Sequence, residues 1–458
     1  MHPKRPRASN ARSSSSKRRL GGAGGPNSPW ASLHEDLVDL IACRVLADDP
    51  VDYMSFRAAC RQWRSSTASP RGRGVADRRF HPRRWMMLPE GHGLHPGHGK
   101  LRGFVRFLNL STGAFARARL PVFRDHCALG SIDGLLLLQR DGDTAVRLLH
   151  PFTADVADFP PLATLLPYAR PLVPLRGAER REQAKWEHLR TVRAAAVSVG
   201  ADGRPTVMML LEAFATVVFS TAGDERWSLA SWHIGGSHAY TPLPFQGKIY
   251  MMQRRHSSNH DPEILIFQID PPQQQQQQQQ QEEDGTMTQQ SSSPMAMPLP
   301  PQLVATFPAS SSDFYLAECN SEVLLVASKH GKDFTVFRLA DIVAQRAAPV
   351  TDIGANSLFL GPRILCVSSK VSPTVASDAI VSIHREGLYL AQYHLGDGTW
   401  SMASDGCILG GAIPIPTSII YHIYTCCFPQ DWNKGRIRYQ GKMKAKWWQV
   451  KGRWRNGA

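Results

Sequence analysis

The stretch GLLLLQRDGDTAVRLLH, residues 134–150, holds two apolar runs that flank Asp141 and Gly142. Such runs on both sides of an Asp-Gly pair are a strong signal for a β-hairpin, because the tight turn between antiparallel strands needs residues that tolerate a positive φ angle. The stretch therefore predicts two paired strands. If similar hairpins follow it, they decide the fold class of the chain.

Three further stretches have the same form. They are AAAVSVGADGRPTVMMLL around Asp202 and Gly203, EVLLVASKHGKDFTVFRL around Gly331, and LYLAQYHLGDGTWSMA around Asp397 and Gly398. The turns lie 61, 129 and 66 residues apart. These intervals are close to one, two and one multiples of a unit of ~60–65 residues, although Gly223 supplies an extra turn. Repeated hairpins predict a large all-β domain over residues 75–428, as a β-propeller or a related array of sheets.

Residues 271–302 interrupt this pattern. The segment PPQQQQQQQQQEEDGTMTQQSSSPMAMPLPPQ carries nine consecutive glutamines and too few apolar side chains to form a core. We expect it to loop out between two strands or blades. Two interpretations remain open: an inert insert, which the composition favours, and a polyglutamine interaction segment.

Residues 32–67 have the spacing of helices. Ser32 followed by Glu35 predicts a capping box at a helix start. Asp49 followed by Pro50 repeats the start signal, with an acidic N-cap and proline at the first helical position. The first helix has an apolar face made of Leu33, Leu37, Leu40, Ile41 and Val45.

A second apolar stripe lies in DYMSFRAACRQWRSST, residues 52–67. At intervals typical of a helix it places Tyr53, Phe56, Cys60 and Trp63. We therefore predict two or three short helices in residues 30–70, and their apolar sides need a partner. That partner lies either in this chain, with the helices as a cap folded onto the β domain, or in another protein.

The helical region resembles an F-box, whose general form is spaced Leu and Ile, a short linker, a second helix and a final Cys-x-x-Trp-x-Ser. Two positions depart from that pattern, with His34 in place of the usual proline and Ala59 in place of the larger valine. The resemblance implies that a Skp-type adaptor binds the residues Leu33, His34, Leu37, Ile41, Leu46, Tyr53, Phe56, Cys60 and Trp63.

The rest of the chain resembles the plant F-box proteins that carry a KIB-type β-propeller, the domain-of-unknown-function 295 group. The resemblance rests on stretches between residues 130 and 400, among them SIDGLLLLQ, LLHPFTADVADFPPL, GDERWSLASW, FQGKIYMM and DFYLAECNSEVLLVAS. It implies a non-catalytic substrate-recognition subunit of a Skp–cullin–F-box type E3 ubiquitin ligase. The F-box would bind the Skp-type adaptor, and through it a cullin scaffold, while the propeller would bind a protein substrate that the sequence does not name.

The net charge of +15 lies at the two ends of the chain. Residues 1–25 contribute +7 and residues 429–458 contribute +8, so the chain between them is neutral. Residues 1–29 are predicted to be a disordered basic tail. A two-part nuclear import signal in this tail, with a solubilising tail as the alternative, would consist of Lys4, Arg5, Lys17, Arg18 and Arg19.

Residues 429–458 interleave aromatic and basic side chains. This composition fits a half-buried edge strand that closes the array, and less well a nucleic-acid-binding segment. Three alternatives to the ligase subunit therefore stay open: a propeller that binds proteins outside any ligase, a nucleic-acid-binding protein that uses its basic ends, and a propeller enzyme with titratable residues clustered in its central channel. We expect nucleic acid to be the less suitable partner.

No pattern in the sequence indicates a cofactor or an enzyme. The eight cysteines are scattered without a Cys-x-x-Cys pair, and His92, His95 and His98 lie in a glycine-rich loop that supplies no fixed metal geometry. No phosphate-binding loop, nucleophile elbow or metalloprotease motif is present. We predict no cofactor, no metal and no membrane span, and a location inside the cell, in the nucleus, the cytoplasm or both.

Overall fold

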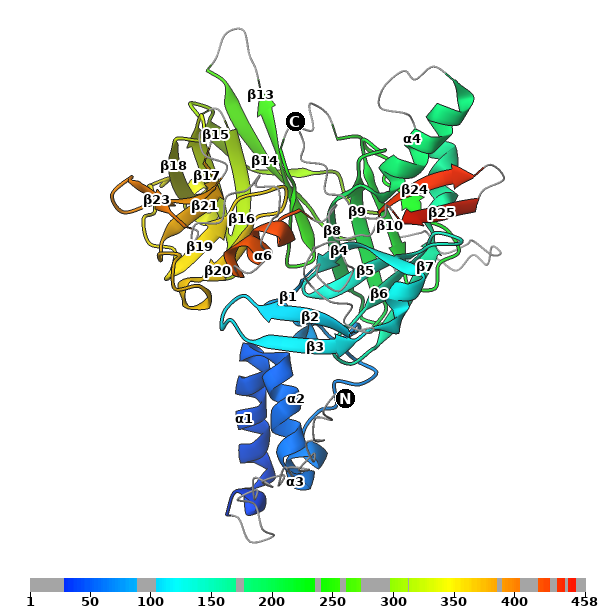
Figure 1. The fold of residues 1–458 in the computed structure, drawn as a ribbon, viewed down its shortest axis with the longest axis vertical. Helices are drawn as coiled ribbons and strands as arrows, with labels where there is room; N and C mark the ends of the chain where they lie inside the picture. Colours follow the sequence, from blue (N-terminus) through cyan, green and yellow to red (C-terminus); the bar gives the residue numbers. More distant parts are fainter. Residues whose placement is uncertain are drawn as a thin grey trace, which may run out of the picture.

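The fold has two parts, a short helical stalk and a six-bladed β-propeller (Figure 1). A computed structural model describes residues 29–88, 104–169, 177–234, 240–255, 261–272, 297–311, 313–384, 389–403, 419–428, 435–440 and 444–449. The order of a small all-α segment and a large all-β domain confirms the predicted fold class. In Figure 1 the stalk, residues 29–65, projects from the propeller beside strands β1–β3.

The stalk contains four short helices, whose bounds are η1 Pro29–Ser32, α1 Glu35–Asp48, α2 Pro50–Ala59 and α3 Arg61–Ser65. The predicted capping box is wrong, because Ser32 lies in η1 and α1 begins three residues later, at Glu35. Its N-cap is His34, whose ring accepts a hydrogen bond from the N–H of Asp36. The second predicted start is confirmed: Asp49 caps α2 by accepting a 2.7 Å hydrogen bond from the N–H of Val51.

The stripe of residues 52–67 belongs to two helices rather than one. Cys60 lies between α2 and α3 in an extended conformation, with φ −148° and ψ 164°. Its sulfur accepts a hydrogen bond from the N–H of Trp63 at 3.3 Å and so caps α3. The chain therefore turns at Cys60, which a count of helical spacing does not predict.

In the part of the chain that the structure describes, six antiparallel or mixed sheets form the blades, which we call A to F in chain order. Blade A contains β1 Trp85–Met87, β2 Phe104–Asn109 and β3 Phe115–Arg119. Blade B contains β4 His126–Ile132, β5 Leu135–Arg140, β6 Ala145–Leu149 and β7 Val156–Pro161. Blade C contains β8 Val192–Val199, β9 Pro205–Leu211, β10 Val217–Thr221 and β11 Ser228–Leu229.

The other three blades follow in the same direction around the ring. Blade D contains β12 Leu243–Phe245, β13 Lys248–Arg255, β14 Glu263–Ile269 and β15 Gln302–Pro308. Blade E contains β16 Asp313–Cys319, β17 Glu322–Lys329 and β18 Asp333–Arg338. Blade F, in the order β20-β19-β21-β22-β23, contains β19 Asn356–Phe359, β20 Leu365–Ser368, β21 Ala379–Ile383, β22 Leu390–His394 and β23 Trp400–Met402.

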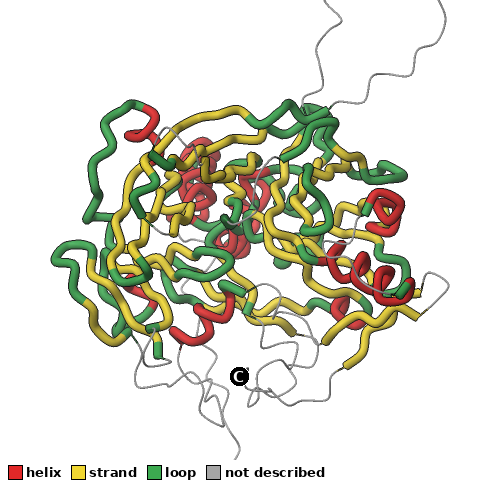
Figure 2. Tube along the Cα trace, turned by 90° about the horizontal axis from the view of Figure 1, so that it is seen from above, coloured by secondary structure: helices red, strands yellow, loops and turns green. Residues whose placement is uncertain are grey.

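Helices are minor additions to these blades, as Figure 2 shows at right angles to Figure 1. Their bounds are η2 Arg78–Phe80, η4 Pro121–Arg124, η5 Leu162–Tyr168, α4 Ala178–Arg190, α5 Leu339–Val343, η6 Ser369–Val371 and α6 Ile419–Cys426. Among the described residues, no helix is long and apolar enough to cross a membrane.

All four predicted hairpins are confirmed by the pairing of their strands. Gly203, Gly331 and Gly398 take the expected positive φ angles, whereas in the first hairpin the residue with positive φ is Thr144 rather than Gly142. The regular unit inferred from their spacing is wrong. The hairpins occupy different places in their blades: Gly203 joins the first two strands of blade C, and Gly398 joins the last two of blade F.

The predicted loop at residues 271–302 connects β14 with β15, which pair as neighbours in blade D. The insert therefore leaves the ladder between two adjacent strands, as expected. The glutamines themselves lie outside the described residues, as do the basic residues of the candidate import signal and the three histidines at 92, 95 and 98.

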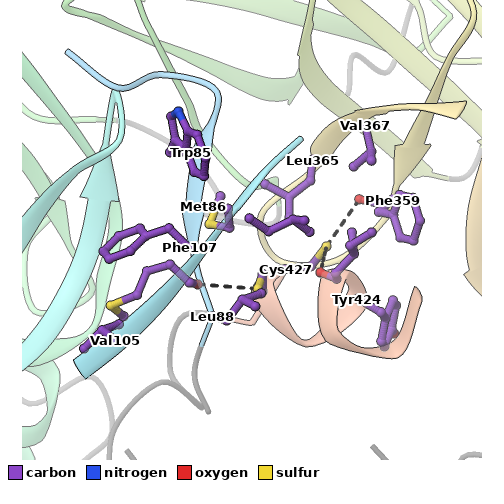
Figure 3. Close-up of a cluster of buried hydrophobic side chains, with 14 of the residues drawn as sticks. Trp85, Met86, Leu88, Val105, Phe107, Phe359, Leu365, Val367, Tyr424 and Cys427 are labelled. Carbon is purple, nitrogen blue, oxygen red and sulfur yellow. Dashed lines mark hydrogen bonds between the residues drawn. The ribbon is translucent and has the colours of Figure 1, made fainter. Parts of the chain in front are cut away.

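The ring is closed by helix α6, which packs where blade F meets blade A (Figure 3). The Cys426 thiol donates to the carbonyl of Met87 in blade A, and the Cys427 thiol donates to the carbonyl of Phe359 in blade F, both at 3.6 Å. Around these contacts lies one apolar cluster that includes Trp85, Phe107, Phe359, Leu365 and Tyr424. The last blade is thus held to the first by side-chain packing.

Residues 429–458 were expected to supply that closure, and this prediction is wrong. The segment does contain strands, β24 Gly435–Gln440 and β25 Lys444–Gln449. Among the described residues these two strands pair with each other and with no other strand, and they lie beside α4, far from the junction of blades A and F (Figure 1).

One buried carboxylate joins the stalk to the propeller. The side chain of Asp49 accepts hydrogen bonds from the indole N–H of Trp85, at 2.9 and 3.0 Å, and from the amide of Asn109 at 2.6 Å. The same carboxylate caps α2. Because Asp49 is 4% exposed, its charge is stabilised by these donors rather than by water.

The chain between the stalk and blade A is tied to blade B. The carboxylate of Asp155 accepts from the backbone N–H groups of Gly72 and Gly74 at 2.9 and 2.8 Å. A Cβ at Gly74 would lie 2.5 Å from the hydroxyl oxygen of Thr153, so only glycine fits there. Nearby, the buried His150 bonds through Nε2 to the carbonyl of Phe80, and its Nδ1 accepts from the N–H of Thr153, both at 3.0 Å.

Replacing the carboxylate of Asp49 by an amide, Asp49→Asn, should lower the free energy of unfolding by about 2–4 kcal/mol, because an N–H₂ group would then face the donors of Trp85 or Asn109. The control is Asp52→Asn, an exposed carboxylate in the first turn of α2. It should cost less than about 1 kcal/mol. Urea unfolding measures both, and equal losses would contradict the structural role given to Asp49.

Acidification should destabilise the protein through His150. Burial lowers its pKa from 6.5 to about 4, so between these values the unfolded state binds more protons than the folded state. Stability should therefore fall as the pH falls from 6.5 towards 4, by at most about 3 kcal/mol from this residue. His150→Asn should be less stable at pH 7 and should lose this part of the pH dependence in urea unfolding. If the free energy of unfolding of His150→Asn depends on pH between 6.5 and 4 as it does in the unmodified chain, this part of the pH dependence does not come from His150.

Candidate functional site

Helix α1 carries apolar side chains on two faces. The inner face, which packs on α2 and the propeller, consists of Val38, Ala42, Val45 and Leu46. The outer face consists of Leu37, Leu40 and Ile41, which are 50%, 52% and 37% exposed. At 3.6 residues per turn the centres of the two faces lie roughly 130° apart. One apolar face is enough to hold a helix on its own protein, so the outer face is available to a partner.

The structure divides the predicted adaptor-binding residues into three groups. Exposed are His34, Leu37 and Ile41, and half-buried are Leu33, Phe56, Cys60 and Trp63. The buried pair is Leu46 and Tyr53, at 9% and 2% exposure. The predicted residues thus include side chains that pack inside the stalk as well as side chains on its free surface.

Tyr53 and Leu46 hold the stalk against the propeller. They share a small apolar cluster with Ala42 and Phe80, and the rings of Tyr53 and Phe80 lie 5.9 Å apart. The hydroxyl of Tyr53 donates to the carbonyl of Ala68 at 2.7 Å. In this conformation neither side chain can reach an adaptor, so the surface open to a partner is narrower than the predicted one.

Phe56 and Trp63 pack on each other. Their rings are stacked with centroids 4.4 Å apart. The indole N–H of Trp63 donates to the carbonyl of Trp30 at 3.1 Å, and Gln62 donates to the carbonyl of Leu33 at 2.9 Å. Helix α3 therefore fixes the segment that leads into α1, and Trp63 has a structural role whether or not a partner touches it.

Two side chains of the exposed surface were not among the predicted binding residues. Leu40 lies one turn from Leu37 on the outer face, and Trp30 of η1 is 63% exposed. The spacing of Leu37 and Leu40 was visible in the sequence, but it did not show which face of α1 the propeller covers. Trp30 precedes the helical pattern, so periodicity gave no signal for it.

A second candidate site is the central channel of the propeller, a cavity of about 1400 Å³. It is lined by residues of β4, β8, β12, β16 and β20, together with Met86 of β1. Each blade thus turns one strand towards the channel, and the end of α1 at Ala47 and Asp48 reaches its mouth. This is the position from which propeller loops commonly hold ligands or partners.

Charged side chains face one another in the channel. The carboxylate of Asp133 lies 3.8 Å from both the Nδ1 of His81 and the guanidinium of Arg78. Burial opposes ionisation of Asp133, but His81 and the nearby arginines hold its pKa below the ordinary value. Burial raises the pKa of Glu318 and lowers that of Arg363. Seven arginines and five acidic residues line the channel, so its lining carries a small excess of positive charge.

Two thiols of the channel, those of Cys127 and Cys366, are held in their protonated form. Burial raises the pKa of Cys127 to about 11. The sulfur atoms of Cys319 and Cys366 lie 2.9 Å apart on neighbouring blades, and that contact, together with burial, raises the pKa of Cys366. A nucleophilic cysteine needs a lowered pKa, whereas the pKa values of Cys127 and Cys366 are raised. Within the described ranges, no group of three or more His, Cys, Asp and Glu side chains is arranged to hold a metal ion.

Comparison with known proteins places the propeller in a family. The family model described as the KIB1-4 beta-propeller matches residues 107–386, from the second strand of blade A into blade F. Comparison with curated proteins gives no match to the sequence. The matched region covers more than half of the chain and the sheets form the expected ring, so the chain belongs to the KIB1-4 beta-propeller family.

Proposed function

We propose that this chain is the substrate-recognition subunit of a Skp–cullin–F-box type E3 ubiquitin ligase. The stalk would bind a Skp-type adaptor and the propeller would bind the protein substrate. The observation that carries the proposal is the outer face of α1, where Leu37, Leu40 and Ile41 stand exposed on a helix that already has a buried inner face.

The energetics of the outer face favour a protein partner. Full burial of a leucine or isoleucine side chain is worth about 1.5–3 kcal/mol relative to full exposure. These three residues are only partly exposed, so their combined gain would be a few kcal/mol, and Trp30 at the same end of the stalk would add to it. An amphipathic helix that lays such a face into an apolar groove is a common mode of protein recognition.

The fixed docking of the stalk on the propeller supports a role in holding a substrate at a set place relative to the adaptor. Because Asp49 fixes the junction of α1 and α2 to β1 and β2, an adaptor on the stalk would be held at a constant place relative to the propeller. A substrate on the propeller would then be kept close to a ubiquitin-charged enzyme on the other side of the adaptor. The chain would act by raising local concentration, without chemistry of its own.

This role needs no catalytic group in the channel. It also implies that the protein works inside the cell, where the adaptor and the cullin scaffold would be found. The F-box likeness of residues 33–65 supports the assignment independently of the propeller.

The test is co-purification of the full chain with a plant Skp-type adaptor, followed by calorimetry. Leu37→Asp combined with Ile41→Asp should weaken adaptor binding at least a hundredfold, because two charges would enter an apolar contact. Thermal unfolding of the isolated chain should change by less than about 2 °C, since both side chains are on the free face.

The control is Val343→Asp, which places one such charge at a 53% exposed apolar residue of α5 on the propeller. It should bind the adaptor like the unmodified chain. A folded, unmodified chain that fails to bind, or equal binding by the double variant and the control, would refute the proposal. In the second case the helices would serve only as a structural part of the molecule.

A further inference from the structure

Blade A is incomplete at its outer edge. Among the described residues, blades B, C and D have four strands each, whereas blade A has three, ordered β1-β2-β3. In the described part of the chain no strand pairs with the outer side of β3. Blade E also has three strands, but its outer strand is bridged by Val350 to Val336. An open edge presents unpaired backbone N–H and C=O groups that a further strand can use.

The face of blade A next to this edge is basic. Residues 104–124 contain Arg106, Arg117, Arg119 and Arg124 and no acidic side chain. Arg106 lies directly opposite Arg117 in the register of β2 and β3. Like charges at directly opposed positions destabilise a pair of strands. The pKa of Arg106 is lowered mainly by burial and, to a smaller extent, by the positive charge of Arg117. A negatively charged ligand beside β3 would be attracted by the exposed guanidinium groups of Arg117 and Arg119.

Aromatic side chains flank the arginines on the same face. Phe104 lies opposite Arg119 and is 41% exposed, while Phe115, two residues before Arg117, is 54% exposed. The alternate residues Val105, Phe107 and Ala118 are buried in the core. Charge on an edge strand often serves to prevent aggregation, but that role does not explain two exposed phenylalanines beside it.

We propose that the outer side of β3 binds an extended acidic segment of a partner protein, which adds to blade A as a fourth strand. Backbone hydrogen bonds to β3 would supply affinity, and alternate carboxylates of the segment would pair with Arg117 and Arg119. Charge decides the occupant: the two basic ends of this chain carry +7 and +8 and would be repelled. A nucleic acid would use the arginines but leave the backbone groups of the edge unpaired. The proposal does not depend on adaptor binding by the stalk.

The probe is a fluorescein-labelled nine-residue peptide of alternating Glu and Val, titrated with the full chain and followed by fluorescence anisotropy. Arg117→Glu combined with Arg119→Glu should weaken binding at least tenfold. The control, Arg180→Glu with Arg181→Glu, makes the same change of charge at exposed residues of α4 and should bind like the unmodified chain. If the first variant does not fold by circular dichroism, Arg119→Ala replaces it, with at least a threefold loss expected.

Four results would overturn the proposal, the last of them with a peptide that contains proline. One is absence of peptide binding by the folded, unmodified chain. Another is equal weakening in the β3 variant and the α4 control, which would show only a long-range effect of charge. The third is binding of a twelve-nucleotide single-stranded DNA, but not of the peptide, that depends on Arg117 and Arg119. A peptide of the same charge with proline at alternate positions should bind at least tenfold more weakly, and equal binding would exclude strand addition.

Discussion

The orientation of the stalk depends on the buried carboxylate of Asp49. Its two oxygens are shared among the start of α2, the indole of Trp85 and the amide of Asn109. A carboxylate away from water needs several donors at once, so this set of bonds forms only when the stalk is docked on blade A. Local capping and tertiary docking are therefore coupled at one residue. The exposed face of α1 acquires a fixed direction because of it.

A second constraint is the closure of the ring without a shared strand. Helix α6 fills the junction between the first and last blades with apolar side chains, and the thiols of Cys426 and Cys427 bond to one blade each. Burial raises the pKa of both thiols, which suits a packing role better than a reactive one. Closure places one strand of each blade around the channel, and among the described residues no strand pairs with the outer edge of β3 in blade A.

Much of this architecture was predictable from local chemistry. The Asp-Gly and His-Gly turns predicted hairpins because few residues tolerate positive φ, and Asp49-Pro50 predicted a helix start because both residues favour it. The sequence did not show that Leu46 and Tyr53 face the propeller while Leu37 faces solvent, since all three are apolar at helical spacing. That distinction depends on Phe80, which is distant in sequence. The donors to Asp49 and the closure by α6 were hidden for the same reason, since each depends on long-range packing.

The most direct test of the account is an experimental structure of the full chain bound to a Skp-type adaptor. The account predicts that Leu37, Leu40 and Ile41 are buried in the interface, and that Asp49 remains within hydrogen-bonding distance of Trp85 and Asn109. An adaptor bound elsewhere, with the outer face of α1 still in water, would contradict the assignment of the stalk. A complex in which the bonds of Asp49 are broken and the stalk has swung away would contradict the fixed geometry on which the proposed function depends.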